Sequence, residues 1–304
     1  MKILRKNIAS RYSQFSVDRN ISQQKIIDDL KKDLNTKKIF KYITGDQDVI
    51  FYYANNDWET QYFETISIIL YYIDVEEIDL IVFKRSLNAF IDYLRNIIND
   101  SFIITFEVPS EDKDIIQLLN NYKFRTIETR LHYYNNNLNN FRYQRFNVRD
   151  ANNEDIQNLK KVASFMRNDY DRFHSDWSFD KNQADKYLET YIENSIKGFA
   201  DLILVPNELN LNADSFLTAN ICKSSWEDID YKISKMVLSA VSSETNRGWY
   251  VKLVSEMTYR LIDEGACCIF MNTQSTNMAV LSTWEKLGYK IGRVTHLLSL
   301  DSND

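Results

Sequence analysis

A polar loop that runs into a helix at a glycine is the part of this sequence best suited to bind an anion. The apolar stretch 235–241, KMVLSAV, precedes the loop, and Gly248 ends it. Helical spacing follows, with Leu253, Met257 and Leu261 on one face. A strand, loop and helix in this order offer unpaired main-chain N–H groups to a phosphate. A plain connection between strand and helix explains the loop equally well.

The loop matches neither common nucleotide-binding motif. The sequence contains no GxxxxGK[ST] and no GxGxxG pattern. The chain has only 6 glycines and 2 prolines, so Gly248 is more informative than a glycine in an average sequence.

The histidines and cysteines show no spacing typical of a metal site or a disulfide framework. They are His132, His174, His296, Cys222, Cys267 and Cys268. The cysteines lie in apolar surroundings, which suits buried thiols in a reducing compartment. We therefore expect no bound metal.

Composition and charge indicate a globular protein. The chain has 304 residues, of which 44% are hydrophobic and 26% charged, with a net charge of −6. An acidic chain is a poor partner for nucleic acid or an anionic membrane. The N-terminal segment lacks the apolar stretch of a signal peptide, and no apolar run is long enough to span a bilayer. We expect a cytoplasmic protein, which could form a homodimer.

Alternating strand-like and helix-like segments predict an α/β fold. In the first half we expect helices at 22–34, 86–100 and 110–122 and strands at 49–54, 79–85, 101–108 and 124–134. In the second half we expect helices at 181–197, 249–264 and 277–287 and strands near 200–205, 214–222, 234–241, 267–272 and 290–300. The polar segment 135–144 is the best linker, so the expected domains are 1–143 and 144–304. No repeat of fixed period is visible.

The second half resembles the GNAT family of acetyl-CoA-dependent N-acetyltransferases. The resemblance begins at NVRDANNEDIQNL (147–159), continues through the loop at Gly248, and ends with Asn277 and the helix end WEKLGYK (284–290). It implies a GNAT fold, a mixed central sheet flanked by helices, preceded by a smaller α/β domain. It also implies acetyl-CoA as acyl donor.

The whole chain is similar to the branch that acylates amino-deoxy sugars on nucleotide carriers, the TDP-fucosamine acetyltransferase type. Three stretches carry this narrower resemblance: NDWETQYFET (56–65), LLNNYKFRTIETRLHYY (118–134) and the segment 171–205 that begins DRFHSDWSFD. The acceptor implied is a nucleotide-linked amino sugar, and the implied pathway is surface-polysaccharide biosynthesis.

The resemblance assigns the donor site residue by residue. The cofactor-binding residues implied are Leu238, Ser239, Ala240, Val241, Arg247, Gly248, Trp249, Tyr250 and Asn277. The sequence departs from the family pattern Q/R-x-x-G-x-G/A because Thr245 replaces the first residue and Tyr250 the last. Trp284 stands where many members have a tyrosine that protonates the departing thiolate, and an indole N–H is not a useful acid near neutral pH. As a candidate catalytic residue, Trp284 could hydrogen-bond the sulfur, or it could only pack against the pantetheine.

Two histidines are candidates for proton transfer. His174 lies in the branch-specific segment, and its reference pKa of about 6.5 suits that role; a structural histidine is an equal alternative. His296, on the last expected strand, is a second candidate. For substrate binding, Arg172 could meet a phosphate or form an ordinary ion pair. Asp57 and Trp58 either shape a domain interface or contact substrate.

Three readings of function follow. The first is acetyl transfer to a nucleotide-linked amino sugar. The second is a GNAT enzyme with another amine or another acyl group. The third is a non-catalytic CoA-binding or interaction module.

Overall fold

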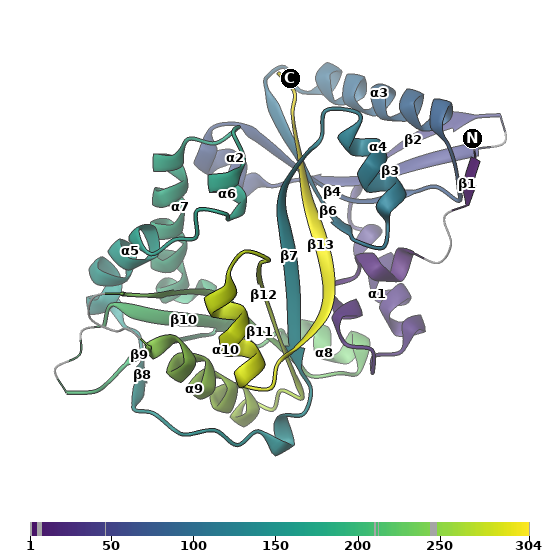
Figure 1. Ribbon diagram of the computed structural model, residues 1–304. Helices are drawn as coiled ribbons and strands as arrows, with labels where there is room; N and C mark the ends of the chain where they lie inside the picture. Colours follow the sequence, from purple (N-terminus) through teal and green to yellow (C-terminus); the bar gives the residue numbers. More distant parts are fainter. Residues whose placement is uncertain are drawn as a thin grey trace. The chain divides into compact units, whose positions relative to one another are not determined.

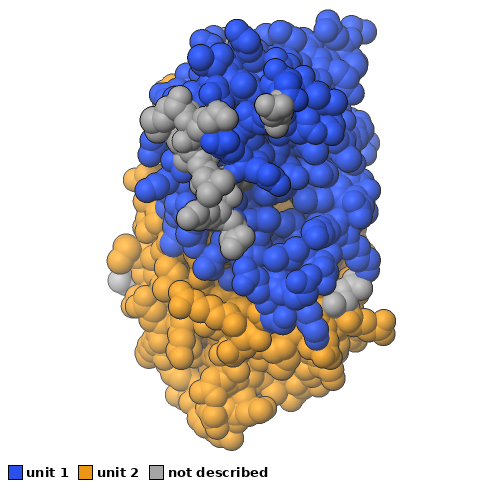
Figure 2. Space-filling model, turned by 90° about the vertical axis from the view of Figure 1, so that its right-hand side faces the viewer, with its two compact units in different colours: residues 1–16, 22–129, 294–304 blue, residues 17–21, 130–293 orange. Residues whose placement is uncertain are grey.

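The computed structural model describes residues 2–4, 8–45, 47–209, 211, 213–243 and 248–303. The chain forms two compact units, coloured separately in Figure 2. Unit 1 comprises Met1–Ser16, Ser22–Thr129 and Val294–Asp304, and unit 2 comprises Val17–Ile21 and Arg130–Arg293. Most of the last strand thus belongs to unit 1, and a short N-terminal segment belongs to unit 2. The division into domains 1–143 and 144–304 stays a prediction.

Unit 1 is built on a mixed sheet with helices. Its strand order is β2 (Lys38–Thr44), β3 (Gln47–Asn55), β4 (Ile66–Asp74), β6 (Phe102–Pro109) and β13 (Lys290–Asp301). Strands β4 and β6 are parallel, and the other neighbours are antiparallel. A small second sheet pairs β1 (Lys2–Leu4) with β5 (Glu77–Asp79). The α-helices are α1 (Gln23–Leu34), α2 (Asp57–Phe63), α3 (Leu80–Ile97) and α4 (Lys113–Asn120).

Helix α3 includes most of a segment expected as a strand. The Asp79 carboxylate accepts hydrogen bonds from the N–H groups of Ile81 and Val82, which caps the helix there. Phe83, Leu87, Phe90 and Leu94 then recur at helical spacing and are buried. The expectation of a strand at 79–85 was therefore wrong, because an apolar run beside a capping carboxylate also begins a buried helix.

The strands of unit 2 also include both parallel and antiparallel pairs. Its strand order is β7 (Arg125–Asn135), β12 (Cys268–Gln274), β11 (Ile233–Val241), β10 (Ser215–Asn220), β9 (Leu202–Pro206) and β8 (Val148–Asp150). Strands β11 and β12 are parallel, and the other neighbours are antiparallel. The α-helices are α5 (Ile156–Phe165), α6 (Arg172–Ser175), α7 (Lys181–Asn194), α8 (Lys223–Ile229), α9 (Trp249–Asp263) and α10 (Met278–Lys286), shown in Figure 1.

Helices cover both faces of the unit 2 sheet. One core joins Leu253 and Met257 of α9 and Leu281 of α10 to strand residues such as Leu217. The other core joins α5 and α7 to Phe216, the neighbour of Leu217 on β10. Adjacent residues of a strand point to opposite faces, so the two cores lie on opposite sides of the sheet. This α/β architecture confirms the expected fold class.

The two units repeat one topology. Each has three antiparallel strands, a helix, a strand parallel to the third, and a second helix: β2, β3, β4, α3, β6 and α4 in unit 1, and β9, β10, β11, α9, β12 and α10 in unit 2. The strand that follows α4 pairs with β12, and the strand that follows α10 pairs with β6. Within the described ranges, no helix has the length and apolar character needed to cross a bilayer.

Candidate functional site

The candidate donor site is built where two parallel strands of unit 2 separate. Strand β11 pairs with β12 only from Ile233 to Lys235 and then continues to Val241 beside β10 alone. In unit 1 the equivalent pair, β4 and β6, stays in register over five residues, from Ile66 to Leu70. The early separation in unit 2 leaves one side of β11 without a neighbouring parallel strand from Met236 onward.

A β-bulge lies within this stretch. Between the pairs Leu217–Ser239 and Ala219–Met236, β11 has one more residue than β10. Thr218 supports the bulge, because its hydroxyl oxygen accepts a hydrogen bond from the Leu238 N–H at 2.9 Å. The Leu238 N–H is therefore used inside the strand pair. Thr218 was not singled out in the sequence, since its role depends on a register that no sequence pattern shows.

The side chains of the expected site residues on β11 alternate between the two faces of the sheet. Leu238 and Ala240 belong to the core with α5 and α7, whereas Val241 packs in the core with α9 and α10. Ser239 hydrogen bonds with the Tyr250 side chain of α9. The structure thus brings Ser239, Val241 and the start of α9 together on one face of the sheet.

Gly248 is the residue that starts α9. Its φ is +88°, a left-handed conformation that a side chain disfavours, and a Cβ there would meet nothing within 4 Å. Trp249 is 4% exposed and packs into the core, with the Lys252 ammonium 4.4 Å from its ring centroid. Thr245 and Arg247, which the resemblance placed in this loop, lie outside the described residues.

The repeated topology provides an internal comparison for this helix start. Helix α3 occupies the equivalent place in unit 1, and the Asp79 carboxylate satisfies its first N–H groups at 2.9 and 3.1 Å. Gly248 has no side chain that could cap α9 in this way. Within the described residues, the first turn of α9 thus lacks the acidic cap that Asp79 provides for α3.

A hydrogen-bonded chain connects three elements of the site. The Trp284 indole N–H on α10 donates to the Tyr250 hydroxyl at 2.8 Å, and this hydroxyl also bonds with Ser239 of β11. Trp284 is 3% exposed, and its ring lies 5.3 Å from that of Tyr133. Burial raises the pKa of Tyr250, although both hydrogen bonds act in the opposite direction. The phenol therefore stays protonated near neutral pH.

Asn277 precedes α10 and directs its amide back to β12. Its Nδ2 donates to the Thr273 hydroxyl at 3.1 Å, and its main-chain N–H donates to the Gln274 carbonyl at 3.0 Å. The Gln274 side chain in turn accepts from Asn168 at 2.9 Å. These bonds fix the turn at the end of β12.

His174 lies between two carboxylates and its side chain is 2% exposed. Nδ1 is 2.8 Å from Asp171 and Nε2 is 3.0 Å from Asp185. Burial alone would lower its pKa, but the Asp171 hydrogen bond and charge, with the Asp185 hydrogen bond, raise it. Both ring nitrogens are thus occupied, which favours a structural imidazolium. The spacing Asp171-x-x-His174, a helix cap followed by histidine, could have indicated this from the sequence.

Arg172 follows this cap in α6. Its guanidinium carbon lies 4.8 Å from the Phe173 ring centroid. The assignment of Arg172 to substrate phosphate stays a prediction.

The remaining expected site residues lie in unit 1. On β13, His296 bonds through its ring nitrogens with the hydroxyls of Ser110 at 3.0 Å and Thr129 at 3.1 Å, and burial lowers its pKa. Asp57 is exposed at the start of α2. Trp58 is 41% exposed, and its ring centroid lies 6.2 Å from that of Tyr62. None of these three belongs to the unit that contains the donor loop.

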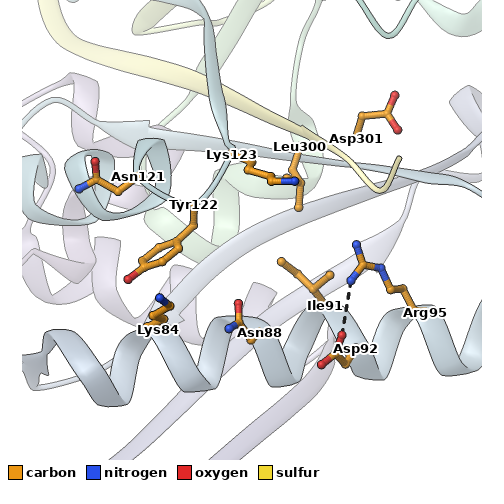
Figure 3. Close-up of a pocket in the computed structure, with 10 residues that line it drawn as sticks. All are labelled: Lys84, Asn88, Ile91, Asp92, Arg95, Asn121, Tyr122, Lys123, Leu300 and Asp301. Atoms are coloured by element: carbon orange, nitrogen blue, oxygen red, sulfur yellow. Dashed lines mark hydrogen bonds and ion pairs between the residues drawn. The ribbon is translucent and has the colours of Figure 1, made fainter. Parts of the chain in front are cut away.

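A hollow of about 530 Å³ in unit 1 is lined by both positively and negatively charged side chains (Figure 3). It lies between α3, the turn after α4 and the end of β13. Arg95 Nη1 is 3.5 Å from Asp92, and the Lys84 ammonium lies 5.6 Å from the Tyr122 ring centroid. With carboxylates and cations side by side, this hollow offers no concentrated charge for a ligand.

Comparison with solved structures identifies the architecture. A GCN5-related N-acetyltransferase from Sphaerobacter thermophilus is similar over 99% of this chain and 96% of its own, with TM-score 0.55 and 8% identity. Another from Kribbella flavida matches over 97% and 96%, with TM-score 0.51 and 8% identity. The fold is that of the GCN5-related N-acetyltransferases.

A third structure with the GNAT fold is a glucosamine N-acetyltransferase region of a fungal multi-domain GH3 β-N-acetylglucosaminidase. It covers 99% of this chain and 38% of its own, with TM-score 0.56 and 13% identity. No family model and no curated protein matches the sequence. At such low identities the structures establish the GNAT fold, whose sheet here includes the separating strands β11 and β12.

Proposed function

We propose that this protein is an acyl-CoA-dependent N-acyltransferase whose donor site lies in unit 2. The observation that carries the proposal is the contrast between two equivalent helix starts. Asp79 caps α3 with a carboxylate, whereas Gly248 starts α9 without a side chain and in a left-handed conformation. A pyrophosphate would be favoured only at α9 by the helix dipole and the first N–H groups.

Acetyl-CoA is the proposed donor. Its pyrophosphate would bind at Gly248 and the first turn of α9, and its pantetheine arm would follow β11 from Leu238 to Val241. Adjacent N–H groups of a strand point to opposite sides. Since the Leu238 N–H points to β10, that of Ser239 points to the side that β12 has left. Ser239 is therefore the proposed main-chain donor to the thioester oxygen.

The chemistry places few demands on the protein. An amine must be neutral to attack a thioester, and its placement beside the carbonyl lowers the barrier by removing the entropy cost of encounter. His174, held as an imidazolium, is poorly suited to accept the proton of the amine. Water is then the simplest path for that proton.

The proposed acceptor is the amino group of a nucleotide-linked amino-deoxy sugar, in surface-polysaccharide biosynthesis. Support comes from the segment 171–205, which resembles the sugar-acylating branch and forms α6, α7 and β9 in unit 2. One structure with the same fold is named for acetylating glucosamine, also an amino sugar. Another amine or acyl group would use the same donor site.

A CoA-binding protein without catalytic activity is the second candidate. The observation in its favour is that the sequence places Tyr250 where the family pattern has a small residue, and Trp284 where many members have an acid. Turnover of acetyl-CoA with any amine would exclude this candidate.

The test of the proposal is thermal unfolding with and without acetyl-CoA. Ligand at a hundred times its dissociation constant stabilises a protein by roughly 2.7 kcal/mol, which raises the unfolding midpoint clearly. We expect this shift with acetyl-CoA and with CoA. An unchanged midpoint at millimolar acetyl-CoA would contradict the proposal. A shift would be followed by turnover assays with nucleotide amino sugars, free amino sugars and simple amines.

A further inference from the structure

A second hollow, of about 330 Å³, lies in unit 2 at the C-terminal end of α10. Its walls are the end of β7, the segment 136–143 that follows, and the turn from α10 to β13. Small-molecule sites in proteins measure about 300 to 1,000 Å³, so this hollow is large enough for a small ligand. Asn277 of the proposed donor site precedes the other end of α10, and the helix is roughly 13 Å long. The hollow is therefore a separate place in the unit.

Positive charge is concentrated in this hollow. Arg142, Lys286 and Lys290 line it, and no described carboxylate does. The hollow in unit 1 differs, because Asp92 and Asp301 line it together with its cations. Within the part of the chain that the structure describes, none of the three cations in unit 2 forms an ion pair with a carboxylate. In a chain with a net charge of −6, this hollow is a local site of positive potential.

Two carboxylates adjoin the residues that line the hollow, and neutral groups bind both. The Glu285 carboxylate accepts from the Tyr133 hydroxyl at 2.9 Å. Asp18 is 1% exposed and accepts from the Asn136 amide at 3.0 and 3.1 Å and from the Tyr231 hydroxyl at 2.7 Å. These carboxylates therefore leave the three cations available to a ligand.

A buried amide in the wall of the hollow has a hydrogen-bond donor to spare. Asn135 is 5% exposed, and its Oδ1 accepts from the Asn137 main-chain N–H at 2.9 Å. That N–H can only donate, so the oxygen of the amide must face it and Nδ2 must face away. Nδ2 lies 3.9 Å from the place that a Cβ on Gly288 would occupy, and it has no hydrogen-bond partner among the described residues. A buried N–H group without a partner costs free energy, which a bound acceptor would recover.

The Arg142 guanidinium is held in place by its own turn. Its Nη1 donates to the Asn139 carbonyl at 3.1 Å and to the Phe141 carbonyl at 2.7 Å. Nε and Nη2 remain as donors for a ligand. Because the side chain is already fixed, binding a ligand costs it less conformational entropy than it would cost a free arginine.

The carbonyls at the end of α10 are satisfied, which reduces the negative charge that a helix C-terminus presents. The Gly288 N–H donates to the Glu285 carbonyl at 3.0 Å, and the Tyr289 N–H donates to the Trp284 carbonyl at 2.9 Å. This closing turn uses the left-handed φ of +82° at Gly288. Lys286 adds a positive charge in the same turn. An anion can therefore approach this helix end.

We propose that this hollow binds the phosphate group of a phosphorylated small molecule. A phosphate monoester has a charge of about −1.5 to −2 near neutral pH and three acceptor oxygens, which match three cations and the Asn135 N–H. A carboxylate has one charge and two oxygens, and would use fewer of these groups. The planar guanidinium of Arg142 suits phosphate in particular. This ligand is additional to acetyl-CoA, and the site does not depend on the function proposed above.

The first experiment measures binding by calorimetry with four probes: inorganic phosphate, glucose 6-phosphate, glucose 6-sulfate and glucose. The two phosphates should bind. The sulfate ester, which carries one charge, should bind at least about fivefold more weakly than glucose 6-phosphate, and glucose should not bind. Failure of both phosphates to bind at about ten millimolar, where even weak sites are occupied, would overturn the proposal.

Asn135→Asp tests the buried donor. The substituted side chain still offers an oxygen to the Asn137 N–H, but it places a second, negatively charged oxygen where Nδ2 stood. We expect the affinity for glucose 6-phosphate to fall at least about tenfold. Asn139→Asp is the matched control, because it adds the same charge to the same turn from an exposed residue outside the hollow. It should change the affinity less than about twofold. Equal weakening by both variants would overturn the site.

Lys286→Gln and Lys290→Gln test the cations with exposed residues, whose replacement should leave the unfolding midpoint unchanged. Each should weaken binding of glucose 6-phosphate about fivefold. Lys161→Gln, on an exposed residue of α5, removes the same charge elsewhere in unit 2 and should have no effect. If all three variants weaken binding alike, only the net charge matters and the proposal is wrong.

Gly248→Val distinguishes this site from the donor loop. Phosphate bound in the hollow should bind this variant as it binds the wild type, and saturating CoA should not displace it. Loss of phosphate binding in Gly248→Val, with normal binding in Asn135→Asp, would place the phosphate at the start of α9 and overturn the site proposed here. A protein that binds phosphate in the hollow but does not bind CoA would contradict only the proposed function.

Discussion

The Nε2 atom of His174 lies 3.0 Å from the carboxylate of Asp185, while Nδ1 of the same ring lies 2.8 Å from Asp171. A neutral imidazole has one N–H, so it could donate to only one of these carboxylates. Arg167 also faces Asp185, at 2.9 Å, and Asp169 at 3.4 Å. The charged ring therefore connects the start of α6 to α7.

Stability should depend on the protonation of His174. Its pKa in the folded protein is raised above 6.5, through Asp171 and Asp185 and against the effect of burial. The stabilisation that the protonated His174 ring provides is present in full below the pKa of this histidine in the unfolded protein. It is lost as the pH rises through the pKa of the same group in the folded protein. The free energies of unfolding of the wild type and His174→Gln, measured in urea, should therefore approach each other with rising pH, by at most about 1.4 kcal/mol per pH unit. A difference that grows with pH would contradict the imidazolium.

Gly248→Val should weaken acetyl-CoA binding without destroying the fold. A β-branched residue at φ +88° is strained by about 1–2 kcal/mol and would narrow the helix start. Gly265→Val is the matched control, because Gly265 has φ +91° and equally open space at the other end of α9. Both variants should lose similar stability, and calorimetry should show weaker binding only for Gly248→Val. Equal affinities would remove this loop from the site.

Glu256 should hold the segment before β8 in place. It is 2% exposed, accepts from the Phe146 N–H, and lies 3.1 Å from Arg145 Nε. Glu256→Ala leaves a partly buried N–H without its acceptor, and we expect a loss of about 1–3 kcal/mol in urea unfolding. Arg145→Ala, from a side chain 61% exposed, should cost under about 1 kcal/mol. Similar losses of stability for both variants would show that Glu256 stabilises the protein mainly through its ion pair with Arg145, and not through its bond to the Phe146 N–H.

Gly292 should tolerate no side chain. A Cβ there would overlap the carbonyl oxygen and a methyl group of Val17, in the N-terminal segment that belongs to unit 2. Because a main-chain carbonyl cannot move without disturbing its neighbours, Gly292→Ala should lower the free energy of unfolding by more than about 1 kcal/mol, measured by thermal unfolding. Removing the methyl group with Val17→Ala should not rescue Gly292→Ala, since the carbonyl remains. Wild-type stability of Gly292→Ala would mean that residue 17 packs elsewhere.

The order of elements in the C-terminal half could be predicted because its periodicity is strong. The expected strand 234–241 and helix 249–264 match β11 and α9 within one residue at each end. Leu253, Met257 and Leu261 are buried as their spacing indicated. The loop residues Thr245 and Arg247 fall outside the described residues.

The contacts of the site could not be predicted, because they depend on register and tertiary packing. Nothing in the spacing of Ser239, Tyr250 and Trp284 shows that their side chains meet. The cap at Asp79 was overlooked because the apolar run after it resembles a strand. The repeated topology was also hidden, since the two units share an arrangement of elements without a periodic sequence.

The pairing of β13 with β6 has a consequence for how the chain folds as it is synthesised. Asp301 pairs with Ile103, so the last strand of unit 1 leaves the ribosome nearly two hundred residues after its neighbour. Until then β6 is an open edge, and an exposed strand edge can pair with another chain. Pairing between such distant residues is slow because a long loop must close. The nascent protein therefore passes through an aggregation-prone stage that lasts until β13 has been synthesised and has paired with β6.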